Sequence, residues 1–504
     1  MKRIFLTIIS LTIAGLCANG QTADTANSVV KCAQAGNDTC QNRLGKWLYE
    51  GSHGYQKDPA KAAQWWLQAA KQNNSEATAN LGFCYMYGTG VDRDSSTASR
   101  LFEKAIKMGN KHVIGIHDSL ARRGTVFSAM LLAHCHRVAI GVERNERTAV
   151  RYYLMAAAKG NVEAMREAAI LKRSAKEDRE ALDLFRKAME KGDVVATYYY
   201  GKMLCEGRGA AKDASKGVAC LSRAAEKDYP AAQYELANAY ANGTGVRADE
   251  AQAFRWYTQA AMGGNRAAWW ERAERLRLGK GVAMDYEAAL ECYTKAYGMG
   301  YNNKLKALLA GDNQEWKETP FMQYLHAVRL LEVDNDPNAA KAEFAKLSKQ
   351  MPAAKTMEAV CMLHPAFKKA NVKKAVKELQ KRAATDQRAA FELAMLQIAG
   401  NGVEKDVAKA EKTLNTMAGN GYWRAVNYLA DCYYEGCNVA KNKDKAILLY
   451  LRAERQQCLT TGGATRLAQA FRNGEGMKAD TGRAEKLEKY KATESKALLE
   501  LVKK

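Results

Sequence analysis

Proline is scarce in this chain, at 6 of its 504 residues. Proline disrupts helix interiors, whereas alanine, leucine, lysine and glutamate, which are abundant here, are good helix formers. The 47% hydrophobic and 26% charged fractions are those of an ordinary soluble protein. We therefore expect an all-α protein with almost no β-strand.

Recognisable catalytic machinery is also missing. In the trio His134, Cys135 and His136 the two histidines point about 200° apart on a helix, so they cannot share one metal ion. The spacing of the cysteines along the chain predicts no zinc site. No glycine loop ends in the Lys-Ser or Lys-Thr of a phosphate site. The sequence predicts no metal, no cofactor and no catalytic step.

The sequence also contains one serine–lysine motif and two histidines that could suggest an active site. A single SxxK motif, Ser28 to Lys31, lacks the SDN and KTG elements of penicillin-recognising enzymes, and one such match is expected by chance. His112 and His117 fall where the repeat pattern described below is interrupted. They either face a cleft or lie on the surface, and we expect the surface.

Acidic residues are outnumbered, because 55 Asp and Glu stand against 77 Lys and Arg, for a formal charge of +22. Such a field attracts anionic partners. The alternative is that the basic side chains only solvate the outward faces of many helices, and this is what we expect.

The first residues have the composition of a secretory signal. Two basic residues precede an apolar run, residues 4–16, that is too short to span a bilayer. We expect cleavage after Gly20. A lipid anchor at Cys17 is not expected, because Leu16 is bulky where a lipobox has a small residue. The chain is therefore expected to be exported, which argues against nucleic acid as its partner.

A glycine motif recurs along the chain. GTGV stands at residues 88–91 and 243–246, GKGV at 279–282 and NGV at 401–403. Gly209, Gly245 and Gly281 are spaced by 36 residues. A fixed period near this length indicates that one short supersecondary unit is stacked in a solenoid.

Residues 230–265 illustrate one unit as two helices joined by a loop. In the first, helix A, the residues on one arc of the helical wheel are Ala232, Leu236, Ala237 and Tyr240. The glycine-rich run 242–245 ends helix A. Asp249 is placed to cap the second helix, helix B, whose apolar residues again recur at helical spacing.

The repeated pattern reads Ala, three residues, Leu-Gly, two residues, Tyr, two residues, Gly-x-Gly-Val and Asp. Examples are ATANLGFCYMYGTGVDRD from Ala77 and AVNYLADCYYEGCNVAKNKD from Ala425. This pattern resembles the Sel1-like repeat family over residues 33–300 and 386–490. The related tetratricopeptide repeat has a period of about 34 residues and lacks this glycine loop. The resemblance implies a right-handed α/α superhelical solenoid, and scaffold or adaptor roles in secretion, signalling and quality control.

The repeats divide the chain into five expected segments. They are a signal peptide at 1–20, a Sel1-like array at 27–300, an irregular helical connector at 301–385, further Sel1-like repeats at 386–490 and a C-terminal helical tail at 491–504. The connector either bends the array or separates two arrays. We expect roughly nine or ten units in all.

Three places depart from the repeat. Val91 and Val142 are 51 residues apart, so we expect an insertion near Lys111 to Thr125. Residues 160–193 form a shortened unit without a glycine loop. In the connector the motif disappears, and helix breaks are expected at Pro320, Pro337, Pro352 and Pro365.

The cysteine count is odd once Cys17 is removed, because 11 of the 12 remain. Cys32 ends one helix and Cys40 begins the next, and their spacing matches the disulfide of the cysteine-rich Helicobacter proteins within the Sel1-like family. We therefore expect a Cys32–Cys40 bridge. The cysteines that recur at equivalent repeat positions are expected to be small buried core residues: Cys84, Cys135 and Cys432 in one register, Cys220 and Cys292 in another.

Aromatic residues recur two and three positions after the first Ala of helix A. Tyr198, Tyr234, Trp270 and Phe391 occupy the first of these positions, and Tyr199 and Tyr428 the second. Both positions fall outside the buried arc, so these six residues are candidate contacts for a partner. The alternative for the first position is packing between adjacent helices, and we leave both open there.

Residues 367–383 form a basic amphipathic helix. Val372, Val376, Leu379 and Ala383 make one apolar stripe, and the basic patch beside it includes Lys369, Lys373, Lys374, Lys377 and Lys381. Such a helix can lie on an anionic membrane or dock an acidic partner. We expect instead a packed helix with a solvated back, so membrane contact is the less favoured interpretation.

We predict an exported, monomeric scaffold that binds a protein partner along its concave helix A face without catalysis. By resemblance to the cysteine-rich relatives, it acts in the periplasm or outside a Gram-negative cell. The alternative, also by resemblance, is a protein that binds or hydrolyses cell-wall muropeptides or β-lactams. In that case Ser28 would react with a penicillin probe, and we expect no labelling.

Overall fold

The computed structural model describes residues 24–300, 319–367, 371–420, 422–455, 458–490 and 499. Throughout these stretches the regular structure is α-helical, without strands, which confirms the all-α prediction. The chain forms two compact units, residues 1–213 and 214–504. The boundary falls inside the segment predicted as one array, and the second unit combines the rest of that array with the connector and the C-terminal repeats. The predicted signal peptide lies outside the described residues, as does nearly all of the predicted C-terminal tail.

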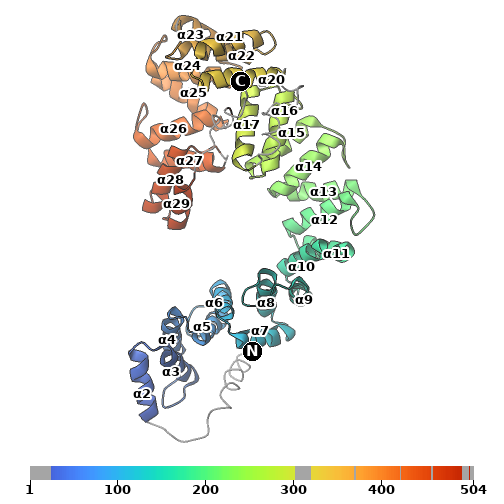
Figure 1. The fold of residues 1–504 in the computed structure, drawn as a ribbon, viewed down its shortest axis with the longest axis vertical. Helices are drawn as coiled ribbons and strands as arrows, with labels where there is room; N and C mark the ends of the chain where they lie inside the picture. Colours follow the sequence, from blue (N-terminus) through green and yellow to red (C-terminus); the bar gives the residue numbers. More distant parts are fainter. Residues whose placement is uncertain are drawn as a thin grey trace. The chain divides into compact units, whose positions relative to one another are not determined.

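Unit 1 is a succession of short helices, most of which contact the next one along the chain (Figure 1). They are α2 (Asp24–Gln34), α3 (Asp38–Glu50), α4 (Pro59–Lys71), α5 (Ser75–Tyr87), α6 (Ser95–Lys107), α7 (Lys111–Arg122), α8 (Val126–Val138), α9 (Glu146–Ala158), α10 (Val162–Ser174), α11 (Asp178–Glu190) and α12 (Val194–Glu206). The shortened unit is the hairpin α10–α11, as the sequence predicts.

Unit 2 continues the same arrangement. Its helices are α13 (Ala214–Ala225), α14 (Pro230–Asn242), α15 (Glu250–Met262), α16 (Arg266–Leu278), α17 (Tyr286–Gly298), α20 (Pro320–Glu332), α21 (Pro337–Leu347), α22 (Ala353–Leu363), α23 (Val372–Arg382), α24 (Gln387–Ala399), α25 (Val407–Gly419), α26 (Trp423–Glu435), α27 (Lys443–Arg455), α28 (Thr461–Asn473) and α29 (Thr481–Glu488). Pro320 and Pro337 open helices, Pro352 caps one and Pro365 follows the end of another, which confirms the four expected breaks.

The hairpin α14–α15 shows why these segments fold as they do. Pro230 stands at the start of α14, where its missing N–H costs nothing. Gly243 ends α14 in the left-handed region, at φ 67°. The Asp249 side chain accepts a hydrogen bond from the Gln252 amide and caps α15. These ends confirm the boundaries read from the sequence.

The second glycine of each loop joins one repeat to the one before it. A Cβ placed on Gly281 would overlap the carbonyl oxygen of Glu250, in the first turn of the preceding helix B. At Gly279, two residues earlier and at the same φ of 68°, the nearest atom to such a Cβ is Met284 Cβ at 3.7 Å, an ordinary van der Waals distance. The first glycine therefore ends a helix, whereas the second lets two repeats approach closely.

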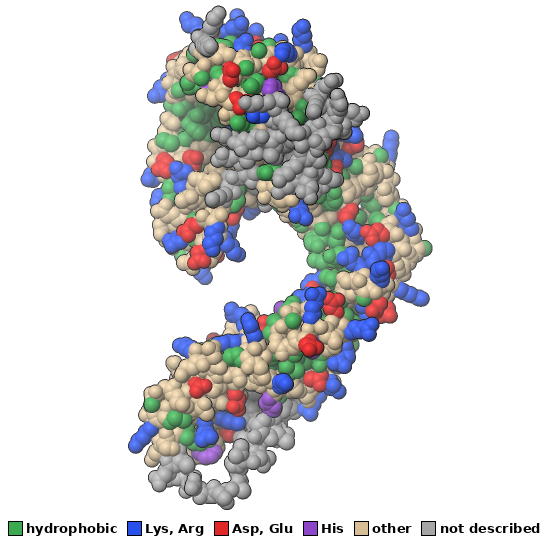
Figure 2. All heavy atoms as spheres, viewed as in Figure 1, with side chains coloured by type: hydrophobic (Ala, Val, Ile, Leu, Met, Phe, Trp, Pro, Cys, Tyr) green, Lys and Arg blue, Asp and Glu red, His purple; other side chains and the backbone are tan. Residues whose placement is uncertain are grey.

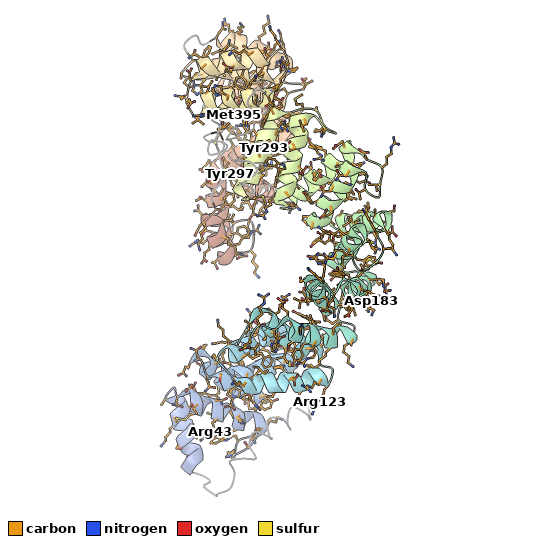
Figure 3. The ribbon with its side chains drawn as sticks, turned by 45° about the vertical axis from the view of Figure 1, so that its right-hand side comes forward. Arg43, Arg123, Asp183, Tyr293, Tyr297 and Met395 are labelled. Carbon is orange, nitrogen blue, oxygen red and sulfur yellow. A yellow bond between two sulfur atoms is a disulfide. The ribbon has the colours of Figure 1, made fainter. Side chains whose placement is uncertain are left out.

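Small residues line the core and large aromatic residues fill the gaps between helices. Buried alanines occur in every described helix except α3, together with rings such as Trp66, Trp269 and Tyr293. Tyr293 and Tyr297 lie on α17, and Met395 lies on α24 (Figure 3). The tyrosines of helix B also bond across the hairpin. The Tyr257 hydroxyl donates to Asn238 at 2.5 Å, Tyr450 donates to Asp431 at 2.7 Å, and Tyr293 donates to Glu274.

The insertion predicted near Lys111 to Thr125 is one additional helix, α7. Because neighbouring helices run antiparallel, one extra helix reverses the direction of the hairpin that follows it. Gly90 packs on Pro59, in the first turn of α4, but its equivalent Gly141 packs on Ile106, in the last turn of α6. The glycine loop before α7 therefore packs on the first turn of the preceding helix B, whereas the glycine loop after α7 packs on the last turn.

Candidate functional site: the helix A surface

Two of the six candidate contact aromatics are packing residues. Tyr198 and Trp270 are each 8% exposed. Tyr198 packs against the Tyr199 ring at 4.9 Å, and Trp270 packs edge-on against the buried Tyr293 at 5.2 Å. For these two residues the packing interpretation applies, because both rings are buried.

Tyr199 of α12 is half-buried and its ring is held on both sides. The Phe185 ring of α11 stacks at 5.1 Å, and the Arg173 guanidinium of α10 lies 4.4 Å from the ring centroid. Such cation–π contacts stabilise by roughly 0.5–1 kcal/mol at exposed sites. The result is an accessible tyrosine beside an arginine, both in defined positions.

The other three candidates are also half-buried, in unit 2. Tyr234 packs edge-on against Tyr257, with ring centroids 5.7 Å apart. Phe391 lies 5.9 Å from the Tyr422 ring and 6.3 Å from the Tyr428 ring. The Tyr428 hydroxyl accepts a hydrogen bond from Asn438 Nδ2 at 3.2 Å, and burial raises its pKa. Their role as partner contacts stays a prediction.

The predicted basic patch belongs to α23. Its Lys373, Lys374, Lys377 and Lys381 are exposed, whereas Lys369 lies outside the described residues. The apolar side of the helix is packed into the core, with Ala375, Val376 and Leu379 buried. This confirms the interpretation as a packed helix with a solvated back, since no apolar stripe is left for a lipid surface.

Basic side chains are spread over both units and mixed with acidic ones (Figure 2). On α11, Asp183 pairs with Arg186 at 2.6 Å and with Lys187 at 2.7 Å, and Arg186 also reaches Glu190 at 3.0 Å. This mixing favours the solvated-surface interpretation of the positive charge over one dedicated anionic site.

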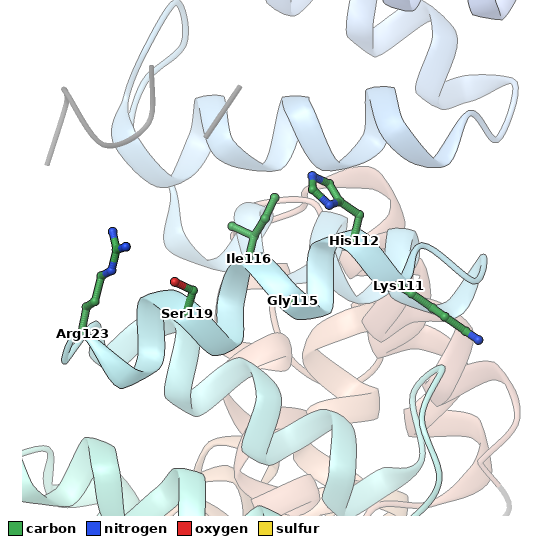
Figure 4. A pocket seen from close by; sticks show the side chains of 6 residues that line it. All are labelled: Lys111, His112, Gly115, Ile116, Ser119 and Arg123. Atoms are coloured by element: carbon green, nitrogen blue, oxygen red, sulfur yellow. The ribbon is translucent and has the colours of Figure 1, made fainter. Parts of the chain in front are cut away.

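A shallow groove of about 560 Å³ runs along the inserted helix α7 (Figure 4). The described residues that line it are Lys111, His112, Gly115, Ile116, Ser119 and Arg123. His112 itself is exposed, which agrees with the surface expectation, and it lies along this groove.

The surface expectation is wrong for His117, which is fully buried. Its Nδ1 lies 2.9 Å from Ser128 Oγ, and its ring is packed among Phe83, Phe102 and Phe127. Burial lowers its pKa to about 3. His117 thus fixes α7 to the array as a neutral imidazole.

An ion cluster that the sequence analysis missed connects the two repeat segments of unit 2. Glu287 of α17 accepts from Arg388 of α24 at 2.8 Å and pairs with Arg424 of α26 at 3.4 Å. Arg388 also pairs with Glu392 at 2.6 Å. Burial alone would raise the pKa of Glu287, but the two arginine charges outweigh it and hold the pKa below its ordinary value. Of the two possibilities for the connector, the structure shows the one in which the repeats bend back on each other.

The cysteines lie where the repeat registers predict. Cys32 and Cys40 form a disulfide with Cα atoms 5.8 Å apart, and their oxidised state in solution stays a prediction. The register residues Cys84, Cys135, Cys432, Cys220 and Cys292 are all buried, which confirms that assignment. Burial raises the pKa of Cys84 and Cys135 to about 12, so these thiols are poor nucleophiles.

The residues that the sequence offers as catalytic or metal-ligating candidates do not form a common site. Ser28 and Lys31 are both exposed on α2. His134 faces Glu103 at 3.8 Å and His136 stacks on Tyr152, while Cys135 between them is buried. In the described ranges no three His, Cys, Asp or Glu side chains gather in a metal-ligand arrangement. None of the helices there is both long and apolar enough to cross a bilayer.

The Sel1 repeat model matches more than half of the chain, in ten stretches: residues 39–74, 75–110, 126–161, 171–193, 194–229, 230–265, 268–301, 387–412, 423–458 and 462–487. Among solved structures the chain is similar to c5321, described as a protective antigen present in uropathogenic Escherichia coli strains displaying an SLR fold. The identity is 23%, over 95% of this chain and 97% of that chain, with a TM-score of 0.36.

Curated relatives share only a short region. The ERAD-associated E3 ubiquitin-protein ligase component HRD3B of Arabidopsis thaliana is 28% identical over 96 residues, 19% of this chain and 16% of the relative. The chitin synthase regulator SKT5 of Saccharomyces cerevisiae is 33% identical over 109 residues, 21% of this chain and 15% of the relative. The chain therefore spans less than a fifth of the length of either protein.

Proposed function

The chain belongs to the Sel1 repeat family, and we propose that it is an exported scaffold that binds a protein partner along the concave helix A face of its repeats, without a catalytic step. Two relatives that share the repeat are named as a ligase component and a synthase regulator, which are roles exerted on other proteins. A stacked array suits this role because it presents equivalent side chains at regular intervals.

The packing and partial exposure of Tyr199 are the main support for this proposal. Its ring is held between Phe185 and the Arg173 guanidinium, and yet the residue is only half-buried. Tyrosine and arginine are enriched among the residues that dominate protein–protein affinity. A side chain that is already held in place loses less conformational entropy on binding, roughly 0.5–1.5 kcal/mol per side chain. Tyr199 and Arg173 therefore form a pre-organised anchor.

Site-specific photo-crosslinking in living cells tests this proposal. A photoreactive residue at position 199 is expected to give a discrete adduct that mass spectrometry identifies as protein. The matched control is position 187 on α11, where an exposed lysine engaged by Asp183 offers no aromatic anchor. Replacing Arg173 with Ala should weaken the adduct at 199. Equal adducts at 199 and 187, or none at either, would contradict the proposal.

The export part of the proposal has its own test. Cell fractionation should place the chain outside the cytoplasm, and N-terminal sequencing should begin at Gln21. A chain that retains Met1 and stays in the cytoplasm would contradict export while leaving the scaffold role open. Labelling of Ser28 by a penicillin probe would favour the β-lactam alternative instead.

A further inference from the structure

The loop after each helix A closes with the same backbone hydrogen bond. The amide of the second residue past the helix donates to a carbonyl five residues earlier, as in the Schellman motif. This bond is seen from Thr89 to Cys84 at 3.0 Å, from Ile140 to Cys135 at 3.0 Å and from Cys437 to Cys432 at 3.2 Å. It also recurs from Thr244 to Ala239 and from Lys280 to Arg275, both at 3.0 Å.

This motif brings two side chains together, because the residues at the two ends of the bond pack against each other. In the loop after α5 the pair is Cys84 and Thr89, and in the loop after α8 it is Cys135 and Ile140. In the loop after α26 both members are cysteines, Cys432 and Cys437. The loop geometry that elsewhere pairs a cysteine with a threonine or an isoleucine therefore pairs two cysteines here.

The two cysteines differ in their exposure to solvent. Cys437 is exposed, whereas Cys432 is buried at 2% exposure. One thiol is therefore open to a reagent in solution, and the other stands behind it within reach of the first.

We propose that Cys432 and Cys437 are a thiol modification site that closes into a loop-spanning disulfide by exchange with a disulfide-bearing donor. The Cys437 thiolate attacks one sulfur of the donor, forms a mixed disulfide and releases the donor's other sulfur as a thiolate. The Cys432 thiolate then attacks Cys437 Sγ and releases the second donor thiolate. Both leaving thiolates take up the protons that the two cysteines lose, so the donor is reduced to two thiols.

The second step is the slow one. Burial raises the pKa of Cys432 to about 12, so little of it is thiolate at neutral pH. The thiolate fraction below the pKa rises tenfold per pH unit, so conversion of the mixed disulfide should accelerate by about 100-fold between pH 7 and pH 9. The Tyr428 hydroxyl accepts a hydrogen bond from Asn438, the residue that follows Cys437, so closure of the loop should change the surroundings of a candidate contact residue of the helix A surface.

The test uses the reduced mature chain with oxidised glutathione as donor, followed by acid quenching, alkylation and tryptic mass mapping. Arg424 and Lys441 bound one tryptic peptide that holds both cysteines. Its alkylated sites should fall from two to none, with a mass lower by two hydrogens than the reduced, unalkylated peptide. In the Cys437→Ser variant, Cys432 should remain alkylated and carry no glutathione.

A gain-of-function control uses the loop after α5. Cys84 already occupies the buried position there, so Thr89→Cys recreates the same pair in another repeat and should close in the same way. Closure of the 432–437 pair in the native chain supports the proposal. A stable glutathione adduct on Cys437 with Cys432 still alkylated overturns it, as does an unmodified peptide under conditions in which the Thr89→Cys loop closes. Failure of both loops to close overturns it as well.

Discussion

Adding one methyl group to Gly281 should weaken the contact between two repeats, whereas the same change at Gly279 should not. Both residues have φ 68°, so an alanine at either position pays the left-handed backbone cost of about 1–2 kcal/mol. Only at Gly281 does the new Cβ overlap a backbone carbonyl, that of Glu250 in the preceding helix B. Displacing that backbone should cost a further ~1–3 kcal/mol.

Native-state hydrogen exchange read by mass spectrometry is the appropriate assay, because repeat arrays open locally and do not always unfold in one step. Amides of α15 should exchange about tenfold faster in Gly281→Ala than in Gly279→Ala, since each 1.4 kcal/mol of lost protection is a factor of about ten. Both variants should protect α15 less than the native chain does. Equal exchange of α15 in the two variants would refute the idea that the second glycine serves repeat stacking.

Three other changes have expected outcomes. Glu287→Gln should lower the free energy of unfolding in urea by about 2 kcal/mol, because two arginines lose their shared counter-charge. Glu291→Gln should cost under ~0.5 kcal/mol, because among the described residues Glu291 pairs with Lys295 of its own helix alone. Lowering the pH from 7 to 4.5 should cost about 2.7 kcal/mol through His117, because the unfolded imidazole binds a proton below its ordinary pKa of 6.5 and the buried one does so only near 3. That contribution should be absent from the stability curve of His117→Gln, so the difference between the native and variant curves should show it. Cys40→Ser should loosen α2 by about 2–3 kcal/mol in limited proteolysis, and a reductant should abolish the difference from the native chain.

Features encoded within one repeat were predictable from the sequence. The hairpin ends at Gly243 and Asp249 follow from local backbone chemistry, and the structure has them where the sequence places them. The burial of Cys84 and Cys432 follows from their shared register, because equivalent positions in a stacked array meet equivalent neighbours. For cysteines in this register, the position within the repeat is therefore enough to predict that the side chain is buried.

Features that depend on a particular neighbour were not predictable. Trp270 is buried while Tyr234 and Phe391, in the same register, are half-buried, because the helices that follow them differ. His117 lies in an insertion, where no repeat template indicates which side of a helix faces inward. Glu287 and Arg388 are 101 residues apart, and no local pattern links them.

The Glu287 cluster limits where a partner can lie on unit 2. Arg388 and Arg424 stand in the first turns of α24 and α26, both helix A elements, and both are already engaged by α17. A partner that follows helix A in this unit therefore meets the segments beyond the first turn. Those segments carry Tyr428 and end in the loop of Cys437. The proposed interaction surface and the thiol pair of unit 2 thus fall on the same end of the repeat, because the other end is occupied by the ion cluster with Glu287.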